Sequence, residues 1–104
     1  MLLKKIKSKK INVLIAGCGY TGYPLADLIS KQDIKVVGYD INKKLVNKLN
    51  SLKNKQNKYL SFTHNINTIK KIDIILISLP TPLTKNFEPD LSYIQNFLNS
   101  CSKI

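Results

Sequence analysis

Three glycines with the spacing G-x-G-x-x-G, at positions 17, 19 and 22, are the residues of this 104-residue chain best suited to hold a ligand. They follow the apolar run 13–16 and precede a segment with helical periodicity, so they predict a turn between a strand and a helix. Unpaired N–H groups and the positive dipole end at a helix start attract phosphate. Asp40 ends the next apolar run, where a carboxylate can bind ribose hydroxyls and repel a 2′-phosphate. The pattern therefore predicts a dinucleotide site that favours NAD over NADP.

Each glycine of the motif has its own expected role. Gly17 permits the sharp turn out of the strand, Gly19 lets the backbone approach the phosphates, and Gly22 lets the helix pack closely on the strand. The same spacing also occurs in glycine-rich turns of other α/β proteins, but the order of strand, turn, helix, strand and acid favours the cofactor. The residues expected to contact the cofactor at this turn are Gly17, Cys18, Gly19, Tyr20, Thr21 and Gly22.

The rest of the chain alternates between segments of strand and helix character. Strands are expected over residues 13–16, 34–39, 59–63 and 72–79, and helices over 20–31, 41–52, 66–71 and 91–101. In the first of these helices, Leu25, Leu28 and Ile29 share the apolar face. This alternation predicts a Rossmann-like α/β fold, a parallel sheet of order 3-2-1-4 flanked by helices. Residues 11–104 are expected to form one NAD-binding domain and residues 1–10 a disordered basic leader.

A proline-rich loop follows the apolar run 72–79. Ligands of open α/β sheets sit beyond the carboxyl ends of the strands, so Pro80, Thr81 and Pro82 are expected to border the nicotinamide end of the cofactor. The prolines stiffen the loop, and Thr81 offers a hydroxyl or backbone contact. A merely rigid turn is the other interpretation, and composition alone leaves the two open.

The chain carries a net charge of +11, from seventeen lysines and no arginine against six acids. Such a charge can indicate nucleic acid, an anionic membrane or an acidic ligand. The lysines are spread through a Lys-, Asn- and Ile-rich background, which is typical of a merely solvated surface. Without arginine or interleaved aromatic residues no nucleic-acid partner is expected. No segment approaches the length of a membrane-spanning helix, and no membrane partner is expected. Cys18 and Cys101 have neither disulfide nor metal-site spacing, which predicts no metal and a reducing, cytoplasmic environment.

Three stretches carry a resemblance to a known family: AGCGYTGYPLA at residues 16–26, VVGYDIN at 36–42 and SLPTPLTKNFEPDLSYI at 78–94. Together they resemble the UDP-glucose/GDP-mannose dehydrogenase family. They are most similar to its branch of UDP-N-acetyl-D-glucosamine and UDP-N-acetyl-D-mannosamine 6-dehydrogenases. The similarity runs from Ile11 through nearly the whole chain, and the third stretch is far more specific than the glycine motif.

The resemblance implies an activity for a full-length parent protein. Members of this family oxidise a sugar C6 alcohol to a carboxylate in two NAD-dependent steps, through a thiohemiacetal on a catalytic cysteine, for polysaccharide biosynthesis. It places residues 17–22 on the pyrophosphate, Asp40 on the ribose and residues 80–82 beside the cofactor. It also places Lys85 and Glu88 near the sugar nucleotide. The catalytic cysteine belongs to a later part of the family, so no catalytic residue is expected here, and the resemblance implies that the domain at residues 11–104 is truncated.

Two further functions stay open on the sequence alone. A non-catalytic nucleotide-binding or regulatory module would keep the fold without the chemistry. A basic RNA-binding protein is the weaker alternative. The outer edge of the strand at 72–79 would lack a neighbour in a sheet of this order, so self-association is also expected.

Overall fold

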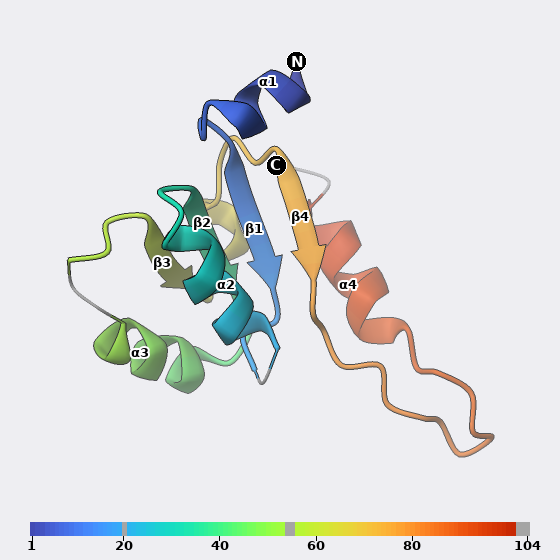
Figure 1. The fold of residues 1–104 in the computed structure, drawn as a ribbon. Helices are drawn as coiled ribbons and strands as arrows, with labels where there is room; N and C mark the ends of the chain where they lie inside the picture. Colours follow the sequence, from blue (N-terminus) through green and yellow to red (C-terminus); the bar gives the residue numbers. More distant parts are fainter. Residues whose placement is uncertain (20, 54–55, 102–104) are drawn as a thin grey trace.

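The computed structural model describes residues 1–19, 21–53 and 56–101. Its sheet has four strands, all parallel, in the order β3-β2-β1-β4 (Figure 1), which confirms the predicted fold class and strand order. The elements are α1 (Leu2–Lys7), β1 (Asn12–Ala16), α2 (Gly22–Ser30), β2 (Lys35–Tyr39), α3 (Lys43–Leu52), β3 (Leu60–Thr63), the 3-10 helix η1 (Ile66–Thr68), β4 (Ile74–Ile77) and α4 (Ser92–Cys101).

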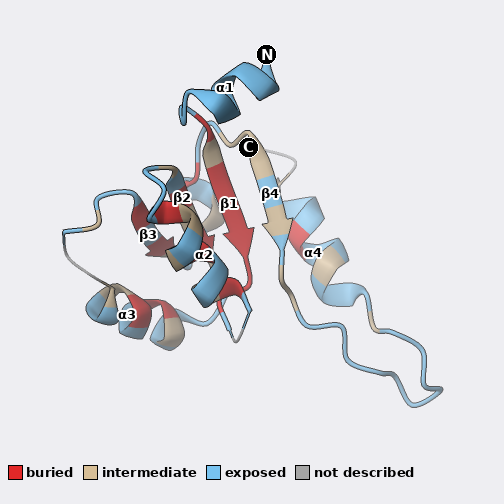
Figure 2. Cartoon of the chain, viewed as in Figure 1, coloured by how far each residue is buried: buried red, intermediate tan, exposed pale blue. Residues whose placement is uncertain are grey.

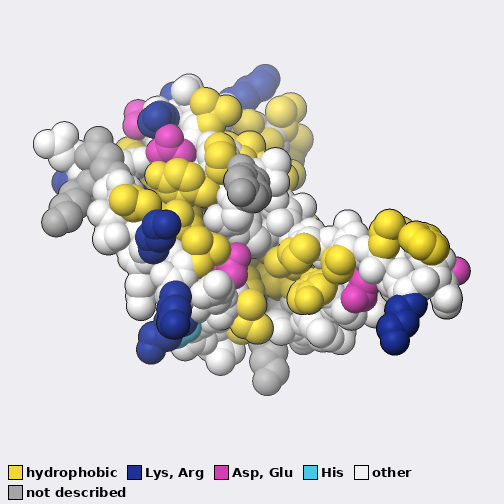
Figure 3. All heavy atoms as spheres, turned by 90° about the horizontal axis from the view of Figure 1, so that it is seen from below, with side chains coloured by type: hydrophobic (Ala, Val, Ile, Leu, Met, Phe, Trp, Pro, Cys, Tyr) yellow, Lys and Arg dark blue, Asp and Glu magenta, His cyan; other side chains and the backbone are white. Residues whose placement is uncertain are grey.

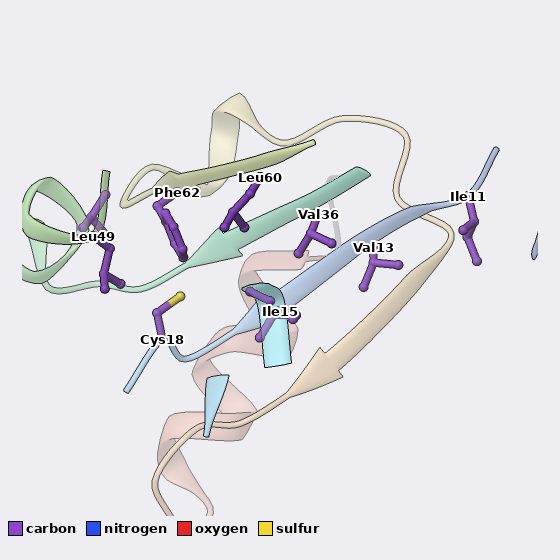
Figure 4. Packing of buried hydrophobic residues seen from close by; sticks show 10 residues of the cluster. Ile11, Val13, Ile15, Cys18, Val36, Leu49, Leu60 and Phe62 are labelled. Atoms are coloured by element: carbon purple, nitrogen blue, oxygen red, sulfur yellow. The ribbon is translucent and has the colours of Figure 1, made fainter. Parts of the chain in front are cut away.

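Strand β1 is buried on both faces of the sheet and divides the core into two layers (Figure 2). Side chains alternate along a strand, so Val13 and Ile15 enter the layer under α2 and α3, where Figure 4 shows them on one side of the sheet. Leu14 and Ala16 enter the opposite layer, where they pack against Phe97 of α4. This two-sided burial explains why the strand reads as a continuous apolar run.

Helix α2 packs on the sheet through small residues. Its buried residues are Gly22, Ala26 and Ser30, which are spaced four residues apart. Leu28, by contrast, is 62% exposed. The expected apolar face is therefore wrong for Leu25 and Leu28, which are both exposed. A stripe without bulky side chains lets the helix axis approach the sheet closely, and the leucines then point away from it.

The expected disordered leader is instead a helix. α1 ends in a Schellman motif: the N–H of Lys9 donates to the carbonyl of Ile6 at 3.1 Å, and the N–H of Lys10 to the carbonyl of Lys5 at 2.9 Å. Lys9 takes the left-handed conformation, with φ +60°, that this motif requires. The Lys5 ammonium also lies 3.0 Å from a carboxylate oxygen of Asp73, just before β4. The motif ends the helix, and the ion pair links α1 to the start of β4 at the amino-terminal end of the sheet.

Several elements are shorter than the sequence predicts. β4 spans four residues rather than the expected 72–79, the expected helix at 66–71 is a single 3-10 turn, and α2 begins at Gly22. β4 lies at the sheet edge, where Ile75 and Ile77 are 37% and 41% exposed. No helix of the described residues is long and apolar enough to cross a membrane.

A projecting arm, residues 82–90, connects β4 to α4 (Figure 1). Its two sides are joined by main-chain hydrogen bonds, from Asp90 to Pro82 at 2.7 Å and from Thr84 to Glu88 at 2.7 Å. Phe87 stands at its turn with φ +59° and is 82% exposed. The arm is thus closed by its own backbone and extends away from the sheet.

Candidate functional site

Gly17 and Gly22 occupy positions where no side chain fits. Gly17 leaves β1 with φ +91°, donates its N–H to the Tyr39 carbonyl at 2.8 Å, and has the Ser78 carbonyl oxygen 2.4 Å from the place of a Cβ. A Cβ on Gly22 would lie 1.8 Å from the Gly17 carbonyl oxygen. The ends of three strands and the start of α2 therefore converge on a turn built from bare backbone.

Gly19, between them, faces open space. Apart from its two chain neighbours, no heavy atom of the described residues lies within 4 Å of the position that its Cβ would take. Thr21 is the N-cap residue of α2, makes no side-chain capping bond, and is followed by a first turn without acidic residues. The positive end of the α2 dipole is thus left uncompensated and can attract an anion, although the N–H of Tyr23 in its first turn already donates to the Gly19 carbonyl at 3.3 Å. Tyr20, also expected at this turn, lies outside the described residues.

Asp40, at the end of β2, is held on the glycine turn by two main-chain hydrogen bonds. Its Oδ2 accepts from the N–H of Cys18 at 3.0 Å, and its Oδ1 accepts from the N–H of Asn42 at 2.9 Å. Asn42 in turn caps α3, where its side chain accepts from the N–H of Leu45 at 3.1 Å. Each carboxylate oxygen retains a lone pair, so Asp40 is oriented and can still accept from a diol.

Cys18 is a structural residue of the turn. It is 1% exposed, and its thiol donates to the Tyr39 carbonyl over 3.5 Å. Burial, and secondly the charge of Asp40, raise the pKa of this thiol to about 12. It stays protonated at neutral pH, so it is no nucleophile, and only its backbone N–H serves the site.

A pocket of about 360 Å³ opens beside Asp40 at the carboxyl ends of β2 and β4. Figure 3 looks at this end of the molecule from below and shows apolar side chains gathered next to the arm. The Tyr39 and Phe97 rings form part of its wall, with centroids 5.8 Å apart. The lining residues are Tyr39, Asp40, Ile41, Leu79, Pro80, Tyr93, Asn96, Phe97 and Ser100. Apolar walls with few polar groups and this volume are typical of small-molecule sites.

The loop after β4 reaches this pocket only in part. Pro80 lines it together with Asp40, whereas Thr81 and Pro82 are not among its lining residues. Thr81 is exposed, and the carbonyl of Pro82 closes the arm. Lys85 and Glu88 are exposed on the arm. The contact of residues 81 and 82 with the cofactor stays a prediction.

The α4 wall of the pocket was missed by the sequence reasoning. Tyr93, Asn96 and Ser100 line it on one side of the helix, next to the buried Phe97. Their spacing of three, four and seven residues marks one helix face. That spacing could have identified the stripe, although it could not have shown which sheet end the stripe faces.

The geometry fits the adenosine and phosphate half of a dinucleotide. The uncapped start of α2 beside Gly19, the oriented carboxylate of Asp40 and the apolar pocket lie along the carboxyl end of the sheet. An anion, a diol and a flat ring match these three places in that order. The described residues hold no group of three or more His, Cys, Asp or Glu side chains that could bind a metal.

Comparison with protein families gives one match over most of the chain. Residues 11–104 match the NAD binding domain of the UDP-glucose/GDP-mannose dehydrogenase family. Among curated proteins, Protein CapL of Staphylococcus aureus is 35% identical over 77% of this chain and 21% of its own length. The UDP-N-acetyl-D-glucosamine 6-dehydrogenase of Pseudomonas aeruginosa is 30% identical over 92% of this chain and 25% of its own.

Solved structures agree with this match. The UDP-D-ManNAc dehydrogenase of Pyrococcus horikoshii superposes with a TM-score of 0.78 and 25% identity, over 90% of this chain and 26% of that one. A ternary complex of the GDP-mannose dehydrogenase of Pseudomonas aeruginosa gives 0.77 and 25%, over 85% and 24%. The chain therefore spans about a quarter of the length of the relatives that it matches.

Proposed function

The chain belongs to the UDP-glucose/GDP-mannose dehydrogenase family as its NAD-binding domain, and from this premise we propose how its residues hold the cofactor. The pyrophosphate lies over Gly19 at the start of α2. Asp40 accepts hydrogen bonds from the adenosine ribose hydroxyls, and the adenine enters the pocket between Pro80 and α4. Pro80, expected from the sequence beside the nicotinamide end, therefore borders the adenine in this proposal, because it lines the same pocket as Asp40. NAD, when bound, supplies a hydride acceptor; the residues of this chain bind it, orient it and shield its adenine from water.

One observation carries this proposal: the carboxylate of Asp40 is already fixed in place. Its bonds to the N–H groups of Cys18 and Asn42 join the end of β2 to the glycine turn. A group that is ordered before the ligand arrives loses little entropy on binding. The same charge also repels a 2′-phosphate, which accounts for a preference for NAD over NADP.

Calorimetric titration with NAD and NADP tests the proposal. Asp40→Asn keeps the size of the side chain but removes its charge, so NAD binding should weaken by about tenfold or more, because hydrogen bonds to charged groups contribute about 1.5–3 kcal/mol. The preference over NADP should shrink at the same time. Asp33→Asn is the matched control, since Asp33 is an exposed acid in the turn before β2, at the opposite end of the strands. Equal losses in both variants would contradict the assignment of Asp40.

For the whole protein we propose a cytoplasmic nucleotide-sugar 6-dehydrogenase that oxidises the C6 alcohol of a UDP-N-acetylhexosamine to a carboxylate. The support is the family match together with a relative named for that activity at 30% identity. The thiol of Cys18 is unfit for the covalent step because its pKa is raised to about 12. The 104-residue chain should therefore bind NAD yet form no NADH from UDP-N-acetylglucosamine. NADH production by this chain alone would overturn the proposal that it binds NAD without carrying out the oxidation.

A further inference from the structure

The amino-terminal helix α1 presents apolar side chains that the fold leaves uncovered. Leu2, Leu3 and Ile6 are 47%, 57% and 41% exposed, and no residue of the helix is buried (Figure 2). Successive positions on a helix are 100° apart, so these three lie within one sector, and Lys4 and Lys7 lie outside it. α1 is therefore a short amphipathic helix with an open apolar face.

The structure also gathers positive charge around this helix. All strands are parallel, so their amino-terminal ends meet at the end of the molecule where α1 lies (Figure 1). Five exposed lysines occur within residues 4–10, and Lys35, Lys58, Lys70 and Lys71 are exposed at or just before the starts of β2, β3 and β4. We call these nine lysines the basic pole. The acids in the segments that carry them are Asp33, before β2, and Asp73, which is already paired with Lys5.

We propose that α1 and the basic pole form a docking surface for an anionic phospholipid bilayer. Lysines attract the negative headgroups, and the exposed Leu2, Leu3 and Ile6 enter the boundary between headgroups and acyl chains. A six-residue helix is only about 9 Å long, so it lies on the membrane surface. Polar nucleic-acid backbones and base edges would gain nothing from three exposed aliphatic side chains, which is why a lipid surface is the better match.

The orientation of α1 agrees with this role. The ion pair between Lys5 and Asp73 links the helix to the amino-terminal end of the sheet. The proposed cofactor pocket lies at the carboxyl ends of β2 and β4. In Figure 1 the strands run from α1 toward these ends, so the pocket and α1 are at opposite ends of the sheet. A chain docked through α1 would keep that pocket open to solvent. The sequence alone predicted no membrane partner because its lysines read as evenly spread; the parallel strands bring them together.

Vesicle flotation of the full 104-residue chain tests the proposal. It should bind phosphatidylcholine vesicles that contain phosphatidylglycerol, should not bind pure phosphatidylcholine, and should be released by salt. The triple variant Leu2→Gln, Leu3→Gln, Ile6→Gln keeps every charge and should lose most binding. Lys4→Gln with Lys7→Gln should weaken binding roughly tenfold to thirtyfold, at about fivefold per lysine.

The double variant Lys43→Gln with Lys44→Gln is the matched control. It removes the same charge from the start of α3, beyond the basic pole, and should bind vesicles like the unchanged chain. Circular dichroism and NAD titration check that each variant is folded, independently of vesicle binding. No binding to anionic vesicles would overturn the proposal. Equal losses in the two lysine variants would do the same, as would tighter binding to RNA that the triple glutamine variant leaves unchanged.

Discussion

The two glycines at positions 19 and 22 should separate ligand binding from stability when each is replaced by alanine. A Cβ on Gly22 would lie 1.8 Å from the Gly17 carbonyl oxygen and 2.8 Å from its carbonyl carbon, where ordinary contact begins at 3.4 Å. These neighbours are backbone atoms in the turn that leaves β1, so neither can rotate away. At Gly19 a Cβ would have no heavy atom of the described residues within 4 Å, its two chain neighbours aside.

The expected magnitudes follow from these distances. Overpacking a tight site costs about 1–3 kcal/mol, and Gly22→Ala should reach the upper end because α2 must shift from the sheet. A loss of about 3 kcal/mol is a large part of the 5–15 kcal/mol typical of a domain, and lowers Tm by about 10–20 °C. Gly19→Ala should leave the stability within about 0.5 kcal/mol, as for other surface changes. Its Cβ would instead fill the space where the pyrophosphate approaches, and should weaken NAD binding about tenfold or more.

Urea unfolding followed by circular dichroism, together with calorimetric titration of NAD, measures both effects on the same samples. Gly22→Ala should lower the urea midpoint and Gly19→Ala should not. Titration should be performed where each variant is fully folded, so that the affinity of Gly19→Ala reports on the site. If Gly19→Ala binds NAD as well as the unchanged chain, the pyrophosphate does not lie over this turn. If Gly22→Ala is as stable as the unchanged chain, the close packing of α2 is wrong.

Three further predictions concern other parts of the molecule. The hydrogen bond from the main-chain N–H of Asn12, and secondly that from the Lys5 ammonium, hold the pKa of Asp73 below its ordinary 3.8. The ionised Asp73 therefore stabilises the fold at neutral pH, and this stabilisation is lost as the pH falls below 3.8 through the lowered pKa. The Asp73→Asn variant should thus have a lower free energy of unfolding at pH 7, and this free energy should fall less steeply at acid pH, as measured by urea unfolding. An unchanged pH dependence would contradict the contacts of Asp73 with Asn12 and Lys5. Cys18 should resist alkylation by iodoacetamide at neutral pH until the chain unfolds, since it is 1% exposed with its pKa raised to about 12; peptide mapping that finds it modified in the native chain would refute its burial. Ile77→Lys should reduce self-association in sedimentation velocity, because Ile77 lies on the open edge β4; equal association would exclude this edge.

The candidate site was predictable where its chemistry is local in the sequence. Gly17 and Gly22 are needed for reasons confined to one strand-turn-helix unit, and the close contacts around them agree with the roles that their spacing predicts. Asp40 follows β2 directly, and its place beside the turn is a consequence of β1 and β2 being neighbours in the sheet. Thr81 and Pro82 could not be placed in the same way, since they stand beyond the strand in a segment whose course depends on the arm.

By itself the sequence determined the alternation of strands and helices after residue 11 and the dinucleotide motif, because strand and helix periodicity and turn chemistry act over a few residues. The sheet order 3-2-1-4 followed from the Rossmann pattern that this alternation matches. Only the tertiary structure decided which faces are covered. The apolar periodicity of α2 pointed to Leu28, yet Ala26 and Ser30 face the sheet, because close packing on β1 favours small residues over larger ones. Likewise α1 is ordered by Asp73, far along the chain, and lysines scattered in sequence meet at one pole because all four strands run the same way. Such long-range contacts have no signature within a short window of residues.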